Sequence, residues 1–352
     1  MHKKVIIAAL DWGLGHATRM IPIVQYYIDK GWQPILASSG DAAILWQQRF
    51  PNKTVYNLPA YNFTYKHKTM VGNVLSQVPK IKKAIKAENA YIDKLVDEHK
   101  PELIISDNRY GVYHSRVKSV FITHQLQVLP PSALSFSSAI LRKLHELFIG
   151  NFTEVWVPDF GEGNNLSGKL SHGFESKLNI KYIGPLSRFK FANELSHKES
   201  HNKLPNIVAL VSGPEPARSE FEAILRKQLG DYKGNYMLLL GKPGEVNAES
   251  DNKIYNHLQD SELEREFQAA DLLISRSGYS TIMDLYNLRK KAVFIPTPGQ
   301  TEQEYLADRF MGLGMFFTMP QGEFNLNIAI EEYNKYSGFE VIDNQPLASL
   351  HH

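Results

Sequence analysis

The segment from Asp271 to Ala307 constrains this chain more than any other. It begins with a short apolar run to Ser275 that has the length and composition of a buried strand, followed by an Arg-Ser-Gly turn. Ser280 or Thr281 then caps an expected helix, and a second strand, 292–295, stops at prolines. A strand, a glycine turn and a helix N-terminus form an anion site, because the first helical amides have no partner inside the helix.

We expect a phosphate to approach the backbone at Gly278, where no side chain intervenes. The residues involved would be Ser277, Gly278, Ser280 and Thr281.

This segment resembles the C-terminal donor signature of the family 28 glycosyltransferases. The matching residues are Ser275, Arg276, Gly278, Asp284, Pro296, Gln303 and Glu304. Asp284 stands where that family usually has Glu, and Glu304 stands at the second position of its Gln pair. The resemblance implies that Asp284 accepts the ribose hydroxyls and that Gln303 and Glu304, in a loop, hold hydroxyls of the donor sugar.

Composition sets broad limits on the kind of protein this is. The 352 residues suit two domains, and 43% apolar and 22% charged residues are ordinary for a globular protein. A net charge of +2 gives no argument for a nucleic-acid partner, and the absence of cysteine excludes disulfides and thiolate metal sites. With no signal peptide or spanning segment recognisable, we expect a cytoplasmic protein, with peripheral contact at the inner face of the membrane left open.

The first strand and its loop carry the first candidate for catalysis. Strand 5–10 leads into the loop 11–16, then a helix from about residue 17 and a strand at 33–38, which is the start of a doubly wound parallel sheet. Ligands bind such sheets beyond the carboxyl ends of the strands, where His16 lies. Thr18 occupies the third glycine position of a dinucleotide fingerprint, so a nicotinamide site matches weakly.

The run from Gly13 to Arg19 also resembles the first loop of the same family, and of a related UDP-sugar hydrolase. The resemblance places Gly15 and His16 at the acceptor side of the site. As alternatives to catalysis, His16 could cap the helix or pack against it.

Two further polar clusters follow strands on the same edge. Asp107 ends the strand 103–106, and His124 follows the strand 120–123. The related family has a His-Glu pair where this chain has His124-Gln125. Asp107 could instead cap a helix, and His124 could hold a loop by hydrogen bonds.

Six lysines and no acidic residue occupy the segment 66–86, which we interpret as a solvated amphipathic helix. A surface for anionic lipid or for a phosphate-bearing acceptor is the alternative.

The second half repeats the architecture. Strand 207–211 is followed by Ser212 and Gly213, the counterpart of a family loop that faces the diphosphate, and Arg218 could supply positive charge where prolines remove amides. A strand at 254–258 would bring Leu258 to the nucleobase. A polar linker is expected at 189–203, and a terminal helix at 328–336.

We therefore predict an α/β protein of two facing Rossmann-like, doubly wound domains, the GT-B fold, with an interdomain cleft. The acceptor domain would span 1–188, the nucleotide-sugar donor domain 204–326, and a terminal helix and tail 327–352.

The expected activity is transfer of a sugar, by family analogy an N-acetylhexosamine, from a UDP-sugar to an acceptor hydroxyl. His16 would be the base, with Asp11 or Asp107 orienting it and His124 beside it. The family inverts the anomeric centre, and no D-x-D motif is present, so we expect inversion without a metal or other cofactor. The acceptor would be a small molecule, a glycan or a lipid-linked sugar. The alternatives are a UDP-sugar hydrolase and a non-catalytic sugar-nucleotide-binding protein.

Overall fold

The computed structural model describes residues 2–61, 70–129, 138–192, 204–243 and 253–339. The chain divides into two compact units, one up to Leu186 and one from Ser187 onward, and each is described by itself. Of the terminal helix and tail expected at 327–352, the helix is α9 (Leu326–Tyr333), which packs into the second unit, and 340–352 lie outside the described residues.

The first unit is built on a seven-stranded sheet in which every pairing is parallel. In spatial order its strands are β3 (Val55–Asn57), β2 (Gln33–Ser38), β1 (Lys4–Ala9), β4 (Leu103–Asp107), β5 (Lys118–Ile122), β6 (Glu154–Val157) and β7 (Ile180–Tyr182). Its helices are α1 (Leu14–Asp29), α2 (Gly40–Arg49), α3 (Met70–His99) and α4 (Ser138–Ile149).

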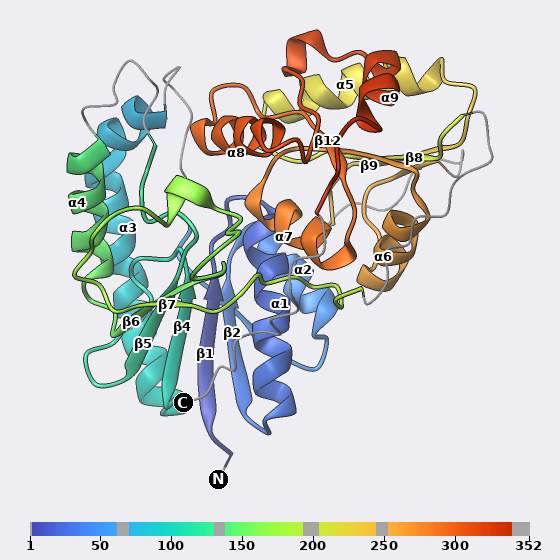
Figure 1. The fold of residues 1–352 in the computed structure, drawn as a ribbon. Helices are drawn as coiled ribbons and strands as arrows, with labels where there is room; N and C mark the ends of the chain where they lie inside the picture. The colour runs from blue at the N-terminus through green and yellow to red at the C-terminus, as the bar shows by residue number, and fades with distance from the viewer. Residues whose placement is uncertain (1, 62–69, 130–137, 193–203, 244–252, 340–352) are drawn as a thin grey trace. The chain divides into compact units, whose positions relative to one another are not determined.

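Helices cover both faces of this sheet. Ile6 and Ala8 of β1 pack with Ile92 and Leu95 of α3, while α1 contacts β1 and β2. Figure 1 shows α1 and α2 on one side of the strands and α3 and α4 on the other. A parallel sheet covered on both faces needs strands that are apolar throughout, as the fully buried run 5–9 is.

A buried ion pair ties α3 to the loop after β4. The guanidinium of Arg109 pairs with Glu88 of α3 and donates to the carbonyl oxygens of Ala9 and Pro59. Glu88 also accepts hydrogen bonds from the Tyr61 hydroxyl at 2.7 Å and the Gly111 amide at 2.9 Å. Both charges are therefore fully partnered, as burial requires.

A second carboxylate lies where β6 begins. Glu154 accepts from Lys118, Lys181 and the Trp156 indole, each at 2.9 Å. Burial alone would raise its pKa, but these three donors lower the pKa to about 2.

The second unit has a five-stranded parallel sheet with the same winding. In spatial order its strands are β10 (Ile254–Tyr255), β9 (Tyr236–Leu239), β8 (Ile207–Leu210), β11 (Leu272–Ser275) and β12 (Ala292–Phe294). Its other helices are α5 (Ala217–Gly230), α6 (Asp260–Ala269), α7 (Tyr279–Leu288) and α8 (Thr301–Gly312).

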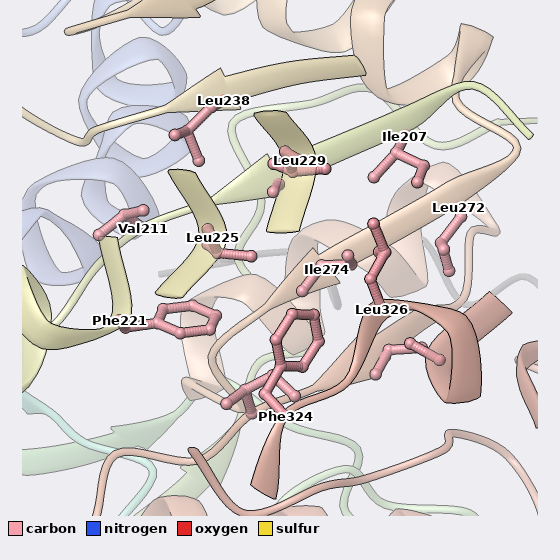
Figure 2. Packing of buried hydrophobic residues seen from close by; sticks show 14 of the residues in the cluster. Ile207, Val211, Phe221, Leu225, Leu229, Leu238, Leu272, Ile274, Phe324 and Leu326 are labelled. Carbon is pink, nitrogen blue, oxygen red and sulfur yellow. The ribbon is translucent and has the colours of Figure 1, made fainter. Parts of the chain in front are cut away.

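One core of the second unit lies between this sheet and α5. Phe221, Leu225 and Leu229 recur at helical spacing and point at the sheet residues Ile274 and Leu238 (Figure 2). Phe324 and Leu326, from the chain just before and within α9, close the same cluster.

Several sequence-based boundaries were wrong, for local reasons. Helix α1 begins at Leu14 rather than near residue 17, because Gly13 adopts φ +91° and ends the loop early, so His16 lies in the first turn. Helix α7 begins after Gly278, which replaces the expected Ser280 or Thr281 as N-cap. The expected Gln- and Glu-rich loop is helix α8, with Gln303 and Glu304 in its first turns. The strand expected at 254–258 ends at Tyr255.

The expected linker and basic helix are described in part. Phe189 is buried against Phe267 and its carbonyl accepts from Asn287, so the start of the expected linker packs within the second unit, while 193–203 lie outside the described residues. The lysine-rich segment forms the first half of α3 from Met70, and 66–69 lie outside the described residues.

Gly111 tests how tightly α3 packs on the loop after β4. A Cβ at Gly111 would lie 2.4 Å from the Ile85 carbonyl oxygen and 2.8 Å from a Glu88 oxygen. We expect Gly111→Ala to lower the free energy of unfolding by about 1–3 kcal/mol, measured by urea denaturation. Gly230→Ala is the control, because its Cβ would meet nothing within 4 Å. Equal midpoints for the two variants would contradict the packing described here.

Candidate active site

Both sheets reverse their winding direction between two central strands. The chain leaves β1 toward β2 and later crosses to β4, and it leaves β8 toward β9 and later crosses to β11. Loops at the carboxyl ends of such strand pairs diverge and leave a crevice where ligands bind. Most of the sequence-predicted residues follow these four strands, while His124 follows β5, Leu258 follows β10, and Gln303 and Glu304 follow β12.

In the first unit, His16 and Arg19 lie on one face of α1. They are three residues apart in the first turns of the helix, so their side chains are neighbours. Thr18, at the third glycine position, donates its hydroxyl to the Gly15 carbonyl at 3.1 Å and helps to hold the turn.

The carboxylate of Asp107, the last residue of β4, contacts both side chains. Arg19 Nε donates to Asp107 Oδ2 at 2.8 Å, and a terminal nitrogen of Arg19 donates to Oδ1. His16 Nδ1 lies 3.2 Å from the same Oδ2. Asp107 is fully buried and Arg19 is 2% exposed, so the pair is shielded from solvent.

His124, which follows β5, completes the group. Arg19 Nη1 lies 3.0 Å from His124 Nδ1, and Arg19 Nη2 lies 3.0 Å from His16 Nδ1. The structure thus brings together all three predicted catalytic residues, His16, Asp107 and His124, and adds Arg19, which lies between them.

The charges in this group affect how it titrates. Burial lowers the pKa of His16 below its usual 6.5, with the positive charge of Arg19 acting in the same direction and Asp107 opposing it. Burial would raise the pKa of Asp107, but Arg19 and His16 lower it overall. At neutral pH the imidazole of His16 is therefore neutral and the carboxylate of Asp107 is ionised.

Of the two carboxylates considered as partners of His16, Asp107 makes the contact. Asp11 instead accepts a hydrogen bond from the Ser39 hydroxyl at 2.7 Å. The orienting role therefore goes to Asp107 on geometric grounds.

In the second unit, the turn between β11 and α7 is open above its glycine. A Cβ at Gly278 would meet only the Thr281 hydroxyl, at 4.0 Å. The first turn of α7, Tyr279 to Thr281, follows this glycine directly. Ser277 is buried, and its hydroxyl donates to the Gln303 carbonyl at 2.7 Å, so this side chain anchors α8.

Arg276, just before that turn, holds three loops together. Its guanidinium donates to the carbonyls of Ala217, Ile295 and Pro296 at 2.9–3.2 Å and to Gln321 Oε1 at 2.6 Å. It also lies 4.3 Å from the ring centroid of Phe221. Burial lowers its pKa to about 10, so the group remains charged at neutral pH. These contacts make Arg276 a scaffold residue of the site.

The loop after β8 passes close to this scaffold. Gly213 has φ +107°, and a Cβ there would lie 3.2 Å from the Thr297 hydroxyl. The carbonyl of Ser212 lies 3.4 Å from Arg276 Nε. Arg218, expected to face a diphosphate, pairs instead with Glu215 at 2.9 Å and Glu222 at 3.2 Å.

The predicted sugar-binding pair accepts hydrogen bonds from the loop that precedes its own helix. Gln303 Oε1 accepts from the Thr297 amide at 2.9 Å, and Glu304 Oε1 accepts from the Gly299 amide at 2.8 Å. These bonds fix the loop between β12 and α8. Both side chains therefore have a structural role in addition to the predicted binding of sugar hydroxyls.

Asp284 lies in an internal contact of the second unit. Its Oδ1 accepts from the Ser187 hydroxyl at 2.6 Å, and its Oδ2 lies 3.5 Å from Arg188, which also pairs with Asp260 at 3.4 Å. Burial raises the pKa of Asp284 to about 6, although Arg188 opposes the shift. Leu258 lies half-buried between β10 and the start of α6.

Sequence reasoning did not assign roles to Arg19, Arg276, Ser187 or Arg188. Arg19 and Arg276 stand inside the motifs already quoted, so helical spacing from His16 could have identified Arg19. Nothing in the sequence links Ser187 or Arg188 to Asp284, which is about a hundred residues away along the chain.

Among the described residues, no group of three or more His, Asp or Glu side chains is placed to hold a metal ion. None of the described helices is both long and apolar enough to cross a membrane.

Comparison with known proteins identifies the second unit. Residues 242–335 match the model of the glycosyltransferase family 28 C-terminal domain. The predicted resemblance to this family is thereby confirmed for residues 242–335. The matched region contains the β11–α7 turn, Asp284, Gln303 and Glu304.

A curated relative and two solved structures extend the comparison. A stretch of 143 residues is 25% identical to the UDP-N-acetylglucosamine–N-acetylmuramyl-(pentapeptide) pyrophosphoryl-undecaprenol N-acetylglucosamine transferase of Methylobacterium sp. (strain 4-46), and it covers 40% of this chain and 36% of that protein. The glycotransferase of kitacinnamycin has a TM-score of 0.60 at 12% identity, covering 94% of this chain and 90% of its own. MurG of Acinetobacter baumannii has a TM-score of 0.53 at 12% identity, covering 93% and 88%. These likenesses confirm the predicted GT-B fold.

We expect Arg276→Met to destabilise the second unit, because it leaves four acceptors in three loops without their donor. The loss should be about 3 kcal/mol or more, read from urea unfolding followed by far-ultraviolet circular dichroism. Arg265→Met is the control, since Arg265 is exposed and pairs only with its neighbour Glu266 among the described residues. If the two variants unfold at the same urea concentration, Arg276 does not hold the loops.

Asp284 should make stability depend on pH in the mildly acidic range. Its folded pKa of about 6 lies above the ordinary 3.8, so its contribution is complete below pH 3.8 and is lost as the pH rises through 6. Asp284→Asn keeps an acceptor for Ser187 but cannot ionise. Relative to this variant, the wild type should lose about 2–3 kcal/mol between pH 4 and pH 7. The exposed Asp308→Asn serves as control, and parallel curves for wild type and Asp284→Asn would contradict the expectation.

Proposed function

We propose that this chain is a glycosyltransferase that moves a sugar from UDP to an acceptor hydroxyl, with inversion at the anomeric carbon. The observation that carries the proposal is the open turn at Gly278, which leads into the N-terminus of α7 inside the region that matches the family 28 model. The helix dipole and the N–H groups that point out of a helix N-terminus favour a diphosphate at such a position.

Transfer needs the acceptor oxygen to lose its proton as it attacks. In the proposed reaction, His16 Nε2 takes the proton of the acceptor hydroxyl while that oxygen forms a bond to the anomeric carbon. The bond from that carbon to the diphosphate oxygen breaks, and its electron pair leaves with UDP. Support for His16 comes from its contact with Asp107, which orients the ring, and from burial, which lowers its pKa and keeps the imidazole neutral and able to accept a proton at neutral pH.

The donor would be held by the second unit. We propose that the first-turn amides of α7 and the loop at Ser212 and Gly213 stabilise the diphosphate without a metal ion. Asp284 would accept the ribose hydroxyls after exchanging its contact with Ser187, while Leu258 would lie near the base. Gln303 and Glu304 would face the sugar, an N-acetylhexosamine by analogy with the relative's name.

The acceptor would be a glycan or a lipid-linked sugar, taken up by the first unit. The relative's name includes a pyrophosphoryl-undecaprenol group, which is a lipid-linked acceptor. The exposed lysines of α3, Lys80, Lys82, Lys83 and Lys86, offer positive charge for such an acceptor at the cytoplasmic face of a membrane.

A UDP-sugar hydrolase remains the second candidate, because the loop that carries His16 suits water as well as a sugar hydroxyl. Release of free sugar from a UDP-sugar at an equal rate with and without acceptor would favour it. Binding of UDP without any turnover would favour a non-catalytic binding protein instead.

A nucleotide screen tests the donor assignment. We expect UDP and UDP-sugars to raise the melting temperature in a thermal-shift assay, with little effect of GDP or dTDP compounds and no change on adding EDTA. Asp284→Ala should abolish the UDP shift, whereas Asp308→Ala, an exposed substitution on α8, should keep it. Stabilisation by GDP or dTDP compounds instead of UDP would make the donor assignment wrong.

A further inference from the structure

Arg19 contacts three other polar side chains of the first unit at once. It reaches Asp107 through two of its nitrogens, His124 Nδ1 at 3.0 Å and His16 Nδ1 at 3.0 Å. A guanidinium is always protonated and can only donate, so each contact dictates what its partner must offer.

For His124 the consequence is a single tautomer. Nδ1 faces an N–H of Arg19, so Nδ1 must present its lone pair. A neutral imidazole with a lone pair on Nδ1 carries its proton on Nε2. In that form His124 donates a hydrogen bond through Nε2 and cannot accept a proton there.

For His16 the same nitrogen has two neighbours of opposite kind. Nδ1 lies 3.0 Å from Arg19 Nη2, a donor, and 3.2 Å from Asp107 Oδ2, an acceptor. The two contacts compete for Nδ1, because the Arg19 N–H needs a lone pair there whereas Asp107 needs a proton. When Nδ1 carries the proton, it donates to Asp107, whose two oxygens have enough lone pairs for Arg19 as well. Nε2 of His16 then carries a lone pair, which a general base needs.

We propose that Arg19 is a positioning residue that gives the two histidines different parts in the reaction. It fixes His124 as a donor through Nε2–H, directed at an oxygen of the bound substrate, and it leaves His16 as the proton acceptor of the pair. The roles of both histidines in catalysis, including the proton on His16 Nδ1, rest on the proposed transferase function, whereas the tautomer of His124 follows from its contact with Arg19.

The geometry also explains why the position holds arginine. Nε and one terminal nitrogen bind the carboxylate of Asp107 side by side, and the terminal nitrogens also reach the two imidazoles. A lysine ammonium is a point charge on a flexible stem and could pair with Asp107 without spanning both rings.

The tautomers can be measured without any substrate. Protein labelled with ¹⁵N-histidine, at a pH where the rings are neutral, gives separate nitrogen shifts for protonated and unprotonated ring nitrogens. We expect His124 to show Nε2–H in the wild type and in Arg116→Met, a control at an exposed arginine of the same unit. Nδ1–H on His124 in the wild type would overturn the proposal.

Two substitutions of Arg19 separate positioning from folding. Arg19→Met leaves Asp107 buried without its cation, so this variant needs a check of its folding by circular dichroism. Arg19→Lys keeps a charge beside Asp107 and should fold. In both we expect His124 to become a mixture of tautomers, and in Arg19→Met the acidic limb of the rate profile should move to higher pH as the pKa of His16 rises. An unchanged His124 signal in folded Arg19→Lys would contradict the role of Arg19.

Activity tests the division of parts. A glutamine amide can replace the Nε2–H donor, whereas it cannot act as a base. We expect His124→Gln to lose no more than about tenfold in kcat, and His16→Gln to lose about 100-fold or more together with the acidic limb of its profile. Equal losses in the two variants would overturn the division. If wild-type protein turns over no nucleotide sugar, the proposed function fails, while the nitrogen shifts still decide the tautomers.

Discussion

Buried guanidinium groups hold the loops on which both candidate sites depend. Removing a guanidinium from water is costly, so each one must find a complete set of acceptors in the folded chain. Arg276 finds them in three loops of the second unit, and Arg109 finds them in Glu88 and in the loops after β1 and β3. Because a buried guanidinium needs hydrogen-bond acceptors, these arginines hold the loops at the carboxyl edges of the sheets in place.

Arg19 differs from those two because its acceptors include side chains able to take part in chemistry. Its charge is matched by Asp107, so the group adds little net charge while still ordering two imidazoles. In the second unit, Arg276 and Arg218 are already paired with protein groups. The proposed anion site beyond its strands therefore depends on backbone amides. The first unit thus holds side chains able to transfer a proton, and the second holds the turn at which we propose that an anion binds.

Much of this could be predicted from the sequence. Strand runs such as 5–10 and 272–275 were recognisable because buried parallel strands are apolar throughout, and the alternation of strands and helices gave the doubly wound class. His16, Asp107 and His124 were expected at one edge because each follows a strand, and in the structure all three contact Arg19. The turn at Gly278 was found by its residues and by family resemblance.

The remainder depended on contacts between residues far apart in the sequence. The contact of Asp284 with Ser187 needs two segments about a hundred residues apart, and no local pattern announces it. Helix α8 was predicted as a loop because its first turn is rich in Gln and Glu. In the structure, Gln303 and Glu304 accept hydrogen bonds from amides of the loop before the helix. Arg218 was expected to face a phosphate, yet carboxylates three residues before it and four after it take its donors.

The carboxylates Glu154 and Asp284 titrate in opposite senses, with a consequence for how the protein responds to acid. The first, held by two lysines and an indole, has a pKa of about 2 and keeps its stabilising charge until the solution is strongly acidic. Asp284 has a pKa of about 6, so its protonation in acid stabilises the folded state. In mild acid, each unit therefore keeps the contribution of its carboxylate to the free energy of unfolding. Stronger acid removes the contribution of Glu154 and so destabilises the first unit before the second. Acid unfolding of this chain need not be a single cooperative transition.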